Sequence, residues 1–355
     1  MKRNPLSFQI NVEKFSIASE SEKRSTNLMR PNTTFFGDAV RRFVKNPVAM
    51  TAFCFIVVLL IMAFIVPLIY PYSYDEVICY RYSITPDASF NYLQPFHYSP
   101  VEQELINNGT FVFPHIFGTD SNGHDYFIRL LVGARTSLIV GFLAALIVLV
   151  IGGTIGALCG YIGGKFDLIV MRIVDVIYSL PDILIIILLS STLSAVFAVN
   201  SSGPFAKLGS GFVSIFIVFA LLYWVGMARL VRGQVLNLRK QEFVMAARAN
   251  GASTARIVFR HLVPNSMSVI FISAALQIPS AIFTESFLSY LGLGVKYPTP
   301  SLGGLASESQ SYITVAGSEK LYMFVVPAVA ICLIVLSLNL LGDGLRDAFD
   351  PKLQK

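Results

Sequence analysis

Charged residues are scarce in this sequence. Only 14% of its 355 residues are Asp, Glu, Lys or Arg, whereas 54% are hydrophobic. Soluble domains carry about a quarter charged residues, so a chain of this composition is expected to lie in lipid. The net charge of +6 does not indicate a nucleic-acid partner, because the basic residues stand between apolar runs and not on one solvated face.

The sequence also has few cysteines, and no cleavable leader is expected. Three of the four cysteines, Cys54, Cys159 and Cys332, lie inside apolar runs, which argues against a disulfide framework or a zinc site. The first 46 residues are polar and contain neither an apolar core nor a small-residue cleavage site, so we do not expect them to form a cleaved signal peptide. The first apolar run is therefore expected to serve as the targeting signal.

Nucleotide-binding and hydrolytic motifs are absent from the sequence as well. The glycines before Lys165 lack the spacing of a phosphate loop, and Phe166 stands where that motif requires Ser or Thr. No paired nucleophile and base or HExxH motif lies within an apolar run, which disfavours an intramembrane hydrolase. Any ATP is thus expected to bind to a partner, and we expect no cofactor, metal or catalytic residue in this chain.

What the sequence does contain is six long apolar runs. A bilayer core of about 30 Å needs about 20 helical residues at a rise of 1.5 Å each. Helices are expected because lipid offers no partner for unpaired backbone groups and the runs show no alternating barrel pattern. The predicted spans of this all-α membrane protein are Val48–Tyr70, Leu138–Leu158, Val176–Val196, Gly211–Ala228, Val269–Tyr290 and Tyr322–Leu341.

The distribution of Lys and Arg predicts the orientation of these spans. Of the 27 basic residues, 21 lie before the first span, after the second, after the fourth or at the C-terminal end, and six lie in the other loops. Basic loops stay in the cytoplasm, so both termini are expected there. The chain then divides into a cytoplasmic tail (1–46), a first transmembrane helix (47–70), an extracytoplasmic segment (71–133), a core with five transmembrane helices (134–345) and a cytoplasmic tail (346–355).

Small residues, prolines and a few charges mark details of the spans. Glycines recur every fourth residue in the second span, which predicts a seam for close helix packing. The prolines are expected to kink their helices, and Asp175 is expected to pair with Arg172 one helical turn away. The glycines are Gly152, Gly156, Gly160 and Gly164, and the prolines are Pro181, Pro279 and Pro327.

The stretch QEFVMAARANGASTARIVFRHLVPN, residues 241–265, interrupts the apolar pattern between the fourth and fifth spans. A short alanine-rich helix is expected from Glu242 to the break at Gly251, where the backbone needs left-handed space. Ser253 is expected to cap a second helix that Pro264 closes before the next span. In that second helix Arg256 and Arg260 share a face.

Two interpretations of this first helix are open on periodicity alone. Phe243 stands as one large side chain near Ala246, Ala247 and Gly251, a surface that another protein can approach closely. The alternative is an amphipathic helix on anionic lipid, but such a helix is expected to present a broad face of Leu, Phe and Trp. The alanine-rich composition therefore favours a protein partner.

This stretch resembles the EAA loop of permease subunits from bacterial ABC importers, in the form found in the C-type subunit of oligopeptide and dipeptide transporters. The residues that match that pattern are Glu242, Phe243, Val244, Ala246, Ala247, Arg248, Ala249, Gly251, Ala252, Ser253, Arg256, Ile257, Arg260, His261, Pro264 and Asn265. Met245 and Asn250 depart from it.

Three further stretches resemble the same subfamily in matching order and spacing. They are FGTDSNGHDYFIRLLVGARTSL, in which His124 replaces the usual arginine, MRIVDVIYSLPDILIIILL in the third span, and ESFLSYLGLGVKYPTPSLGGL, in which Leu302 stands where tryptophan is usual. The resemblance covers roughly residues 41–70 and 116–351. It implies an ABC importer type I permease fold with six transmembrane helices in the bacterial inner membrane.

The resemblance also implies a role for the loop and a set of partners. The loop forms a coupling helix that docks in a groove of a cytoplasmic ATPase subunit, so ATP and Mg would be bound by two such subunits. A second permease subunit, an extracytoplasmic substrate-binding protein and membrane lipid complete the expected partners, and His261 is expected to be structural. The implied ATPase-coupling residues are Glu242, Phe243, Ala246, Ala247, Arg248, Gly251, Arg256, Arg260 and Pro264.

Two questions stay open at the level of sequence. The segment 71–133 is longer than the subfamily usually has and is rich in aromatic residues, which fits either a docking surface for the binding protein or second permease, or a self-packed cap. Peptides are the substrate that the subfamily favours, although related permeases carry nickel chelates and other solutes. An ion-gradient-driven secondary transporter is the alternative function, and it predicts broken helices and midplane charges.

Overall fold

The protein is described by a computed structural model over residues 35–82, 87–199, 210–295, 299–313 and 319–349. Within these ranges the regular secondary structure is helical, apart from one isolated bridge between Thr119 and Asp125. The tail residues 1–34 and 350–355, for which we predict a cytoplasmic location, lie outside the described residues. The α-helices are α2 (Phe35–Lys45), α3 (Pro47–Ile69), α4 (Cys79–Tyr82), α5 (Pro100–Asn107), α6 (Tyr126–Ile162), α7 (Gly164–Ser179), α8 (Asp182–Val199), α9 (Ser210–Val218), α10 (Trp224–Leu238), α11 (Glu242–Ala249), α12 (Thr254–Ile257), α13 (Val263–Tyr290), α14 (Leu302–Glu308) and α15 (Tyr322–Phe349).

Five continuous helical stretches are long and apolar enough to cross a membrane, and α7 with α8 supplies a sixth when the bent pair is one span. Two of the stretches contain a π-turn: Phe219–Tyr223 joins α9 to α10, and Val258–Leu262 joins α12 to α13. The prediction of an all-α membrane protein is confirmed, with five candidate spans or, if the bent pair is one span, the predicted six.

The ends of the spans differ from the prediction. Helix α6 begins at Tyr126 and not at Leu138, so it starts inside the range assigned to the extracytoplasmic segment. Its first turns hold the buried Arg129, whose guanidinium pairs with Asp120 and Glu308. Because a prediction from hydropathy leaves charged residues out of a span, it places the start of this helix too late. The fourth span continues to Leu238, the fifth begins at Thr254 and the sixth ends at Phe349.

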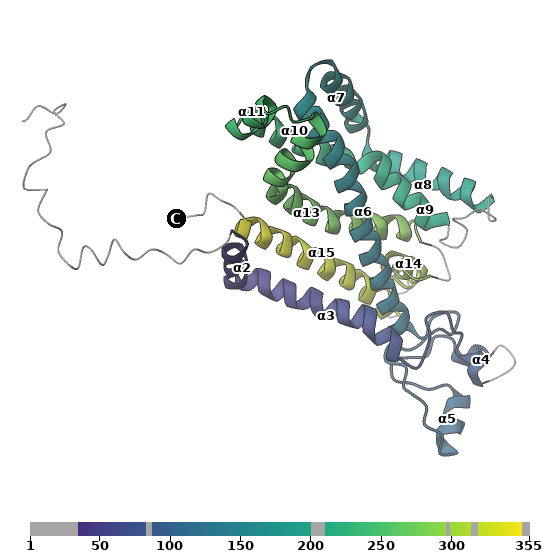
Figure 1. Cartoon of the computed structure of the whole chain (residues 1–355). Helices are drawn as coiled ribbons and strands as arrows, with labels where there is room; N and C mark the ends of the chain where they lie inside the picture. Colours follow the sequence, from purple (N-terminus) through teal and green to yellow (C-terminus); the bar gives the residue numbers. More distant parts are fainter. Residues whose placement is uncertain (1–34, 83–86, 200–209, 296–298, 314–318, 350–355) are drawn as a thin grey trace, which may run out of the picture.

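Helix α6 is the axis of the fold (Figure 1). Its 37 residues give it a length of roughly 55 Å, more than a bilayer core requires. Buried clusters lie on three sides of it: one with α3, α13, α14 and α15, one with α10 to α13, and one with α8, α9 and α13. Helix α6 therefore touches almost every other span.

The glycine seam predicted in the second span lies against α10. A Cβ atom on Gly156 would stand 2.4 Å from the Ala228 backbone oxygen, and one on Gly152 would stand 2.6 Å from that of Trp224. Gly160 meets the Arg232 backbone oxygen at 2.8 Å. Gly164 does not belong to the seam, because the chain turns at Gly163 and nothing lies near a Cβ at 164.

The three prolines behave differently from one another. Pro279 and Pro327 lie inside continuous helices, so the chain does not break at either residue. At Pro181 the helix breaks instead: α7 ends at Ser179, Leu180 is extended, and the two halves of the span meet at 92°. Proline disfavours the helical conformation of the residue before it, which explains why the predicted continuous span Val176–Val196 is wrong.

Asp175 pairs with a residue other than the predicted Arg172. Its Oδ1 lies 2.7 Å from Nη2 of Arg229 on α10. One turn further along α10, Arg232 forms a bidentate pair with Asp167, with distances of 2.5 and 2.7 Å. These two ion pairs fasten α7 along α10.

Residues 70–125 form a small domain-like unit with a core of its own. The rings of Tyr72 and Phe90 are fully buried in it together with Ile78 and Cys79. The crowd of aromatics thus packs internally in part, as in a self-packed cap, while Tyr80, Phe96 and Phe111 remain exposed.

A buried histidine connects this unit to α6. The ring of His115 lies between two buried carboxylates, with Nδ1 2.8 Å from Asp125 Oδ2 and Nε2 3.0 Å from Glu102 Oε1. Burial lowers the pKa of His115, but the hydrogen bonds to Asp125 and Glu102 outweigh it and raise the pKa from 6.5 to about 9. Asp125 also caps α6 by accepting a hydrogen bond from the Ile128 amide at 3.1 Å.

Candidate functional site

The segment singled out in the sequence forms a short helix held at one end of the bundle. Helix α11 begins after Gln241 and carries Glu242 in its first turn, at the positive end of the helix dipole. Val244 is 1% exposed and inserts into the buried cluster that α6, α10, α12 and α13 share. This residue, which matches the family pattern but is not among the predicted coupling residues, anchors the helix.

The opposite face of α11 is open. Phe243 is 38% exposed, and Met245, Ala246 and Ala249 are exposed as well. The predicted large side chain among small ones is present, with one difference: Ala247 packs against the buried cluster and not beside Phe243 at the surface. The free face therefore offers one aromatic ring bordered by methyl groups and backbone.

The turn after α11 is a Schellman motif, which accounts for the glycine. Gly251 has φ of +75°, and its amide donates to the Arg248 carbonyl at 3.0 Å. The Ala252 amide donates to the Ala247 carbonyl at 3.1 Å, and both alanines contact the same cluster. The predicted left-handed turn at Gly251 is present in the structure.

The second helix is longer than expected. The Ser253 side chain caps α12 by accepting a hydrogen bond from the Arg256 amide, as predicted. Pro264 does not close the helix, because the π-turn Val258–Leu262 carries the chain directly into α13. Asn265 donates to the His261 carbonyl at 2.6 Å and Ser266 to the Leu262 carbonyl at 2.8 Å, so side chains reinforce the backbone around the proline.

Two arginines tie the segment to α6. The Arg248 guanidinium lies over the ring of Tyr161, 5.5 Å from its centroid, and the Arg239 guanidinium donates to the Gly160 carbonyl at 3.1 Å. Arg256 and Arg260 stay exposed. Of the predicted coupling residues, Arg248 is thus partly structural, whereas Tyr161 and Arg239 lacked any sequence signal that links them to this site.

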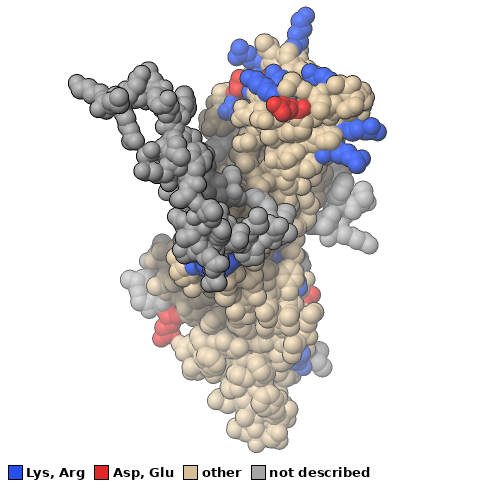
Figure 2. Space-filling view, turned by 60° about the vertical axis from the view of Figure 1, so that its left-hand side comes forward, with Lys and Arg blue, Asp and Glu red and all other residues tan. Residues whose placement is uncertain are grey.

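Positive charge gathers around this segment. Figure 2 shows Lys and Arg concentrated at the end of the molecule where Figure 1 places α7, α10 and α11, above a broad uncharged belt. This end therefore combines basic residues, an exposed aromatic side chain and a rigidly held helix, which is a suitable surface for a macromolecular partner.

Comparisons with known proteins agree with this geometry. Residues 152–355 match the family "Binding-protein-dependent transport system inner membrane component", and residues 34–95 match "N-terminal TM domain of oligopeptide transport permease C". The chain is 38% identical over 347 residues to the dipeptide transport system permease protein DppC of Bacillus subtilis (strain 168), covering 98% of this chain and 95% of that protein.

Two further relatives span a similar length. The chain is 36% identical over 341 residues to the oligopeptide transport system permease protein OppC of the same bacterium, covering 96% of this chain and 97% of OppC. It is 38% identical over 314 residues to the glutathione transport system permease protein GsiD of Escherichia coli O6:K15:H31 (strain 536 / UPEC), covering 88% of this chain and 89% of GsiD.

Proposed function

Because this chain belongs to the family of binding-protein-dependent transport system inner membrane components, we propose that α11 is the coupling helix through which ATPase subunits drive it. It is a multi-pass protein of the bacterial inner membrane and a permease subunit of an ABC importer.

The observation that carries the proposal is the two-sided character of α11. Its inner face is fixed by Val244 and by the turn at Gly251, whereas its outer face presents Phe243 among small residues. A force applied to Phe243 is passed to the cluster shared by α6, α10 and α13, because a close-packed core transmits strain. Helix α11 is therefore placed to transmit motion from a partner protein to the membrane helices.

The expected assembly follows from this role of α11. Two ATPase subunits bind ATP and Mg on the cytoplasmic side, and one of them grips the coupling residues Glu242, Phe243, Ala246, Ala247, Arg248, Gly251, Arg256, Arg260 and Pro264. A second permease subunit completes the translocation path. The concentration of basic residues at the α11 end supports a cytoplasmic location for that end.

The exposed aromatics of the 70–125 unit support contact with an extracytoplasmic substrate-binding protein. Phe111 is 85% exposed, and Phe96 is exposed while its backbone has φ of +60°, a conformation that costs free energy for a non-glycine residue. Aromatic side chains held out in this way are frequent anchors of protein interfaces. Their position at the end opposite α11 fits this assignment (Figure 1).

Peptides are the proposed cargo. The relatives are named for dipeptides, oligopeptides and glutathione, all of which contain peptide-type amide bonds. Ion-gradient-driven transport is disfavoured by family membership, although one broken helix, the α7–α8 pair, is a feature that secondary transporters also have.

Uptake by the purified complex in proteoliposomes tests this function. We expect accumulation of a labelled dipeptide that needs internal ATP and binding protein and persists when ionophores dissipate proton and sodium gradients. Gly251→Trp is expected to abolish uptake while the complex remains folded by size-exclusion chromatography. Accumulation driven by a proton or sodium gradient without ATP would overturn the proposal.

A further inference from the structure

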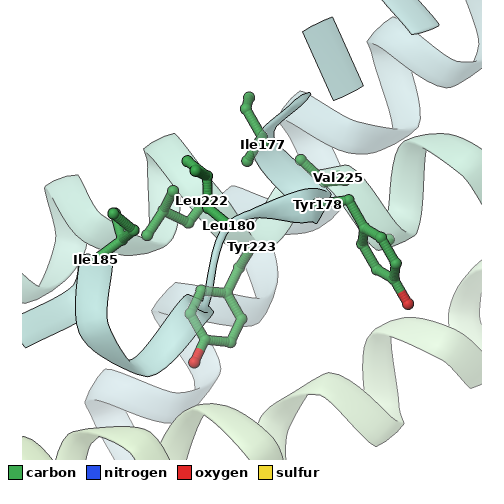
Figure 3. A pocket seen from close by; sticks show the side chains of 8 residues that line it. Ile177, Tyr178, Leu180, Ile185, Leu222, Tyr223 and Val225 are labelled. Atoms are coloured by element: carbon green, nitrogen blue, oxygen red, sulfur yellow. The ribbon is translucent and has the colours of Figure 1, made fainter. Parts of the chain in front are cut away.

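A cavity of about 440 Å³ lies where α7 meets α8, against α10 (Figure 3). Its size is in the range of binding sites for small ligands. The residues that define it are Tyr178 and Leu180 at the end of α7, Ile185 on α8, Leu222 and Tyr223 in the π-turn, and Gly226 on α10. Nothing lies within 4 Å of a Cβ built on Gly226, so the space in front of it is open.

The cavity lies at membrane depth. Asp167 pairs with Arg232, Asp175 pairs with Arg229 and the cavity brings Ile177 beside Val225, so α7 follows α10 toward the middle of its span. The lining residues Leu222 to Gly226 are central in the apolar stretch Gly211–Leu238. The chain break at Leu180 therefore stands within the hydrocarbon region.

Two departures from α-helical geometry meet at this cavity. The break at Leu180 leaves carbonyl groups at the end of α7 without their i+4 amides, and the π-turn Phe219–Tyr223 displaces the ladder of the fourth span. Irregular backbone at membrane depth is tolerated only where protein buries it or where it lines a water-filled space. Tyr178 is 68% exposed and Leu180 is also exposed, so this chain does not bury the break.

The cavity is lined by apolar side chains and by the phenol groups of two tyrosines. Leu180, Ile185 and Leu222 provide the apolar wall, and Figure 3 shows the rings of Tyr178 and Tyr223 pointing in different directions. The Tyr223 hydroxyl is held 2.9 Å from the Thr284 hydroxyl of α13. The Arg229 guanidinium lies 4.2 Å from the centre of the Tyr178 ring and fixes its orientation.

We propose that this cavity is a substrate-contact site on the translocation path, which receives an apolar or aromatic side chain of the transported peptide. The inference rests on the proposed function. The apolar wall takes the side chain, and the two tyrosines of the lining offer hydroxyl groups to the polar groups of the peptide. Gly226 has no side chain to occupy the cavity, so the residue at position 226 determines how large a substrate side chain fits.

Water access tests the path without knowledge of the substrate. After the exposed native residues Cys54 and Cys332 are replaced by alanine, Gly226→Cys in the assembled complex is treated with a permanently charged methanethiosulfonate. Leu333→Cys, at an exposed apolar position of α15, is the control. We expect modification at 226 to be at least about tenfold faster than at 333 in the nucleotide-free or the ATP-trapped state. Equal or slower modification at 226 in both states would overturn the inference.

Substrate size tests the assignment of the cavity to peptide side chains. Gly226→Phe is compared with Gly233→Phe, seven residues along α10, where a Cβ also meets nothing within 4 Å. Filling the cavity is expected to lower the ratio of phenylalanylphenylalanine to alanylalanine uptake by about tenfold, whereas the control leaves the ratio unchanged. An unchanged ratio in Gly226→Phe would contradict the assignment. If the unmodified complex imports neither dipeptide, the proposed peptide function fails, and the water-access result still decides whether the cavity is on the path.

Discussion

At the scale of single residues, Gly251 is the position on which the coupling turn depends. Its φ of +75° is the left-handed conformation that closes the Schellman motif, and no atom lies near a Cβ at this site. A substitution is therefore opposed by backbone strain and not by a clash, at a cost of about 1–2 kcal/mol for ordinary residues. Asparagine tolerates this conformation, whereas β-branched residues do not.

This distinction gives a matched pair of variants. Gly251→Val is expected to lower the amount of substrate transported per ATP hydrolysed, because the turn that holds α11 is distorted, while Gly251→Asn is expected to retain it. Simultaneous measurement of uptake and phosphate release in proteoliposomes reads this ratio. Equal ratios for the two variants would indicate that the left-handed turn has no part in coupling.

His115 is the residue with the most distinctive pH dependence. Its pKa is raised to about 9 in the folded protein, compared with 6.5 in the unfolded chain, so its contribution is fully present below about pH 6.5 and is lost as pH rises through about 9. The shift corresponds to stabilisation on the order of 3 kcal/mol. The protonated ring holds Glu102 and Asp125 together at the start of α6.

The corresponding experiment is thermal unfolding in detergent between pH 6.5 and pH 9.5. The unmodified protein is expected to lose stability over this interval, and His115→Gln is expected to be less stable at pH 6.5 with a flatter profile. If the unfolding temperatures of the two proteins changed in parallel with pH, the pKa of His115 would not be raised in the folded protein.

At the scale of elements, apolar runs determine where the spans lie but not where the helices end. The apolar run after Gly211 and the alanine-rich pattern after Glu242 are visible in sequence because both follow local rules of hydropathy and propensity. The cap Asp125 is a local feature, but the burial of Arg129 in the first turns of α6 depends on Glu308, a partner from a distant part of the chain. Such partners leave no local signal.

The same limit applies to the helix irregularities. Pro181 is visible in the sequence, but whether a proline breaks a helix depends on neighbouring groups that bond to the carbonyls it leaves unpaired. The helix breaks before Pro181 and continues through Pro279. The two π-turns carry no proline or glycine within them. Helix α11 could be predicted from its alanine-rich composition. The contacts of Val244, Tyr161 and Arg239 that anchor it are visible only in the tertiary structure.

The α6–α10 seam allows a comparison between two neighbouring glycines. A Cβ on Gly156 would lie 2.4 Å from a backbone oxygen of α10, whereas the nearest atom to a Cβ on Gly153 is a leucine methyl group at 4.0 Å. Gly156→Ala is expected to separate the helices and cost about 1–3 kcal/mol, because backbone cannot yield as a side chain does. Gly153→Ala is expected to be neutral. Unfolding midpoints in detergent measure both, and equal midpoints would contradict the close approach.

The ion pair between Asp167 and Arg232 joins α7 to α10, and a charge exchange tests it. Asp167→Arg and Arg232→Asp are each expected to lower the unfolding midpoint, and the double variant is expected to recover part of the loss, with a coupling free energy of about 1 kcal/mol. Additive losses in the double-mutant cycle would mean that the pair does not fasten α7.

At the scale of the whole molecule, α6 links the two ends of the protein. Its C-terminal half forms the seam with α10 and contacts the cluster that anchors α11, while its N-terminal residues are held by Asp125 and the buried Arg129. We infer that movement imposed on α11 would be passed to the 70–125 unit through this one continuous helix. The cavity at the α7–α8 break lies between these ends, beside the α10 segment that packs on α6.

The central claim is that the exposed face of α11 is gripped by an ATPase subunit in the cytoplasm. A photoreactive phenylalanine analogue placed at position 243 in the assembled transporter tests it most directly, with the same analogue at exposed Phe283 of α13 as the control. The account predicts a covalent product with the ATPase subunit from position 243 and none from position 283. A product from position 243 with lipid alone, or with an extracytoplasmic protein, would contradict it.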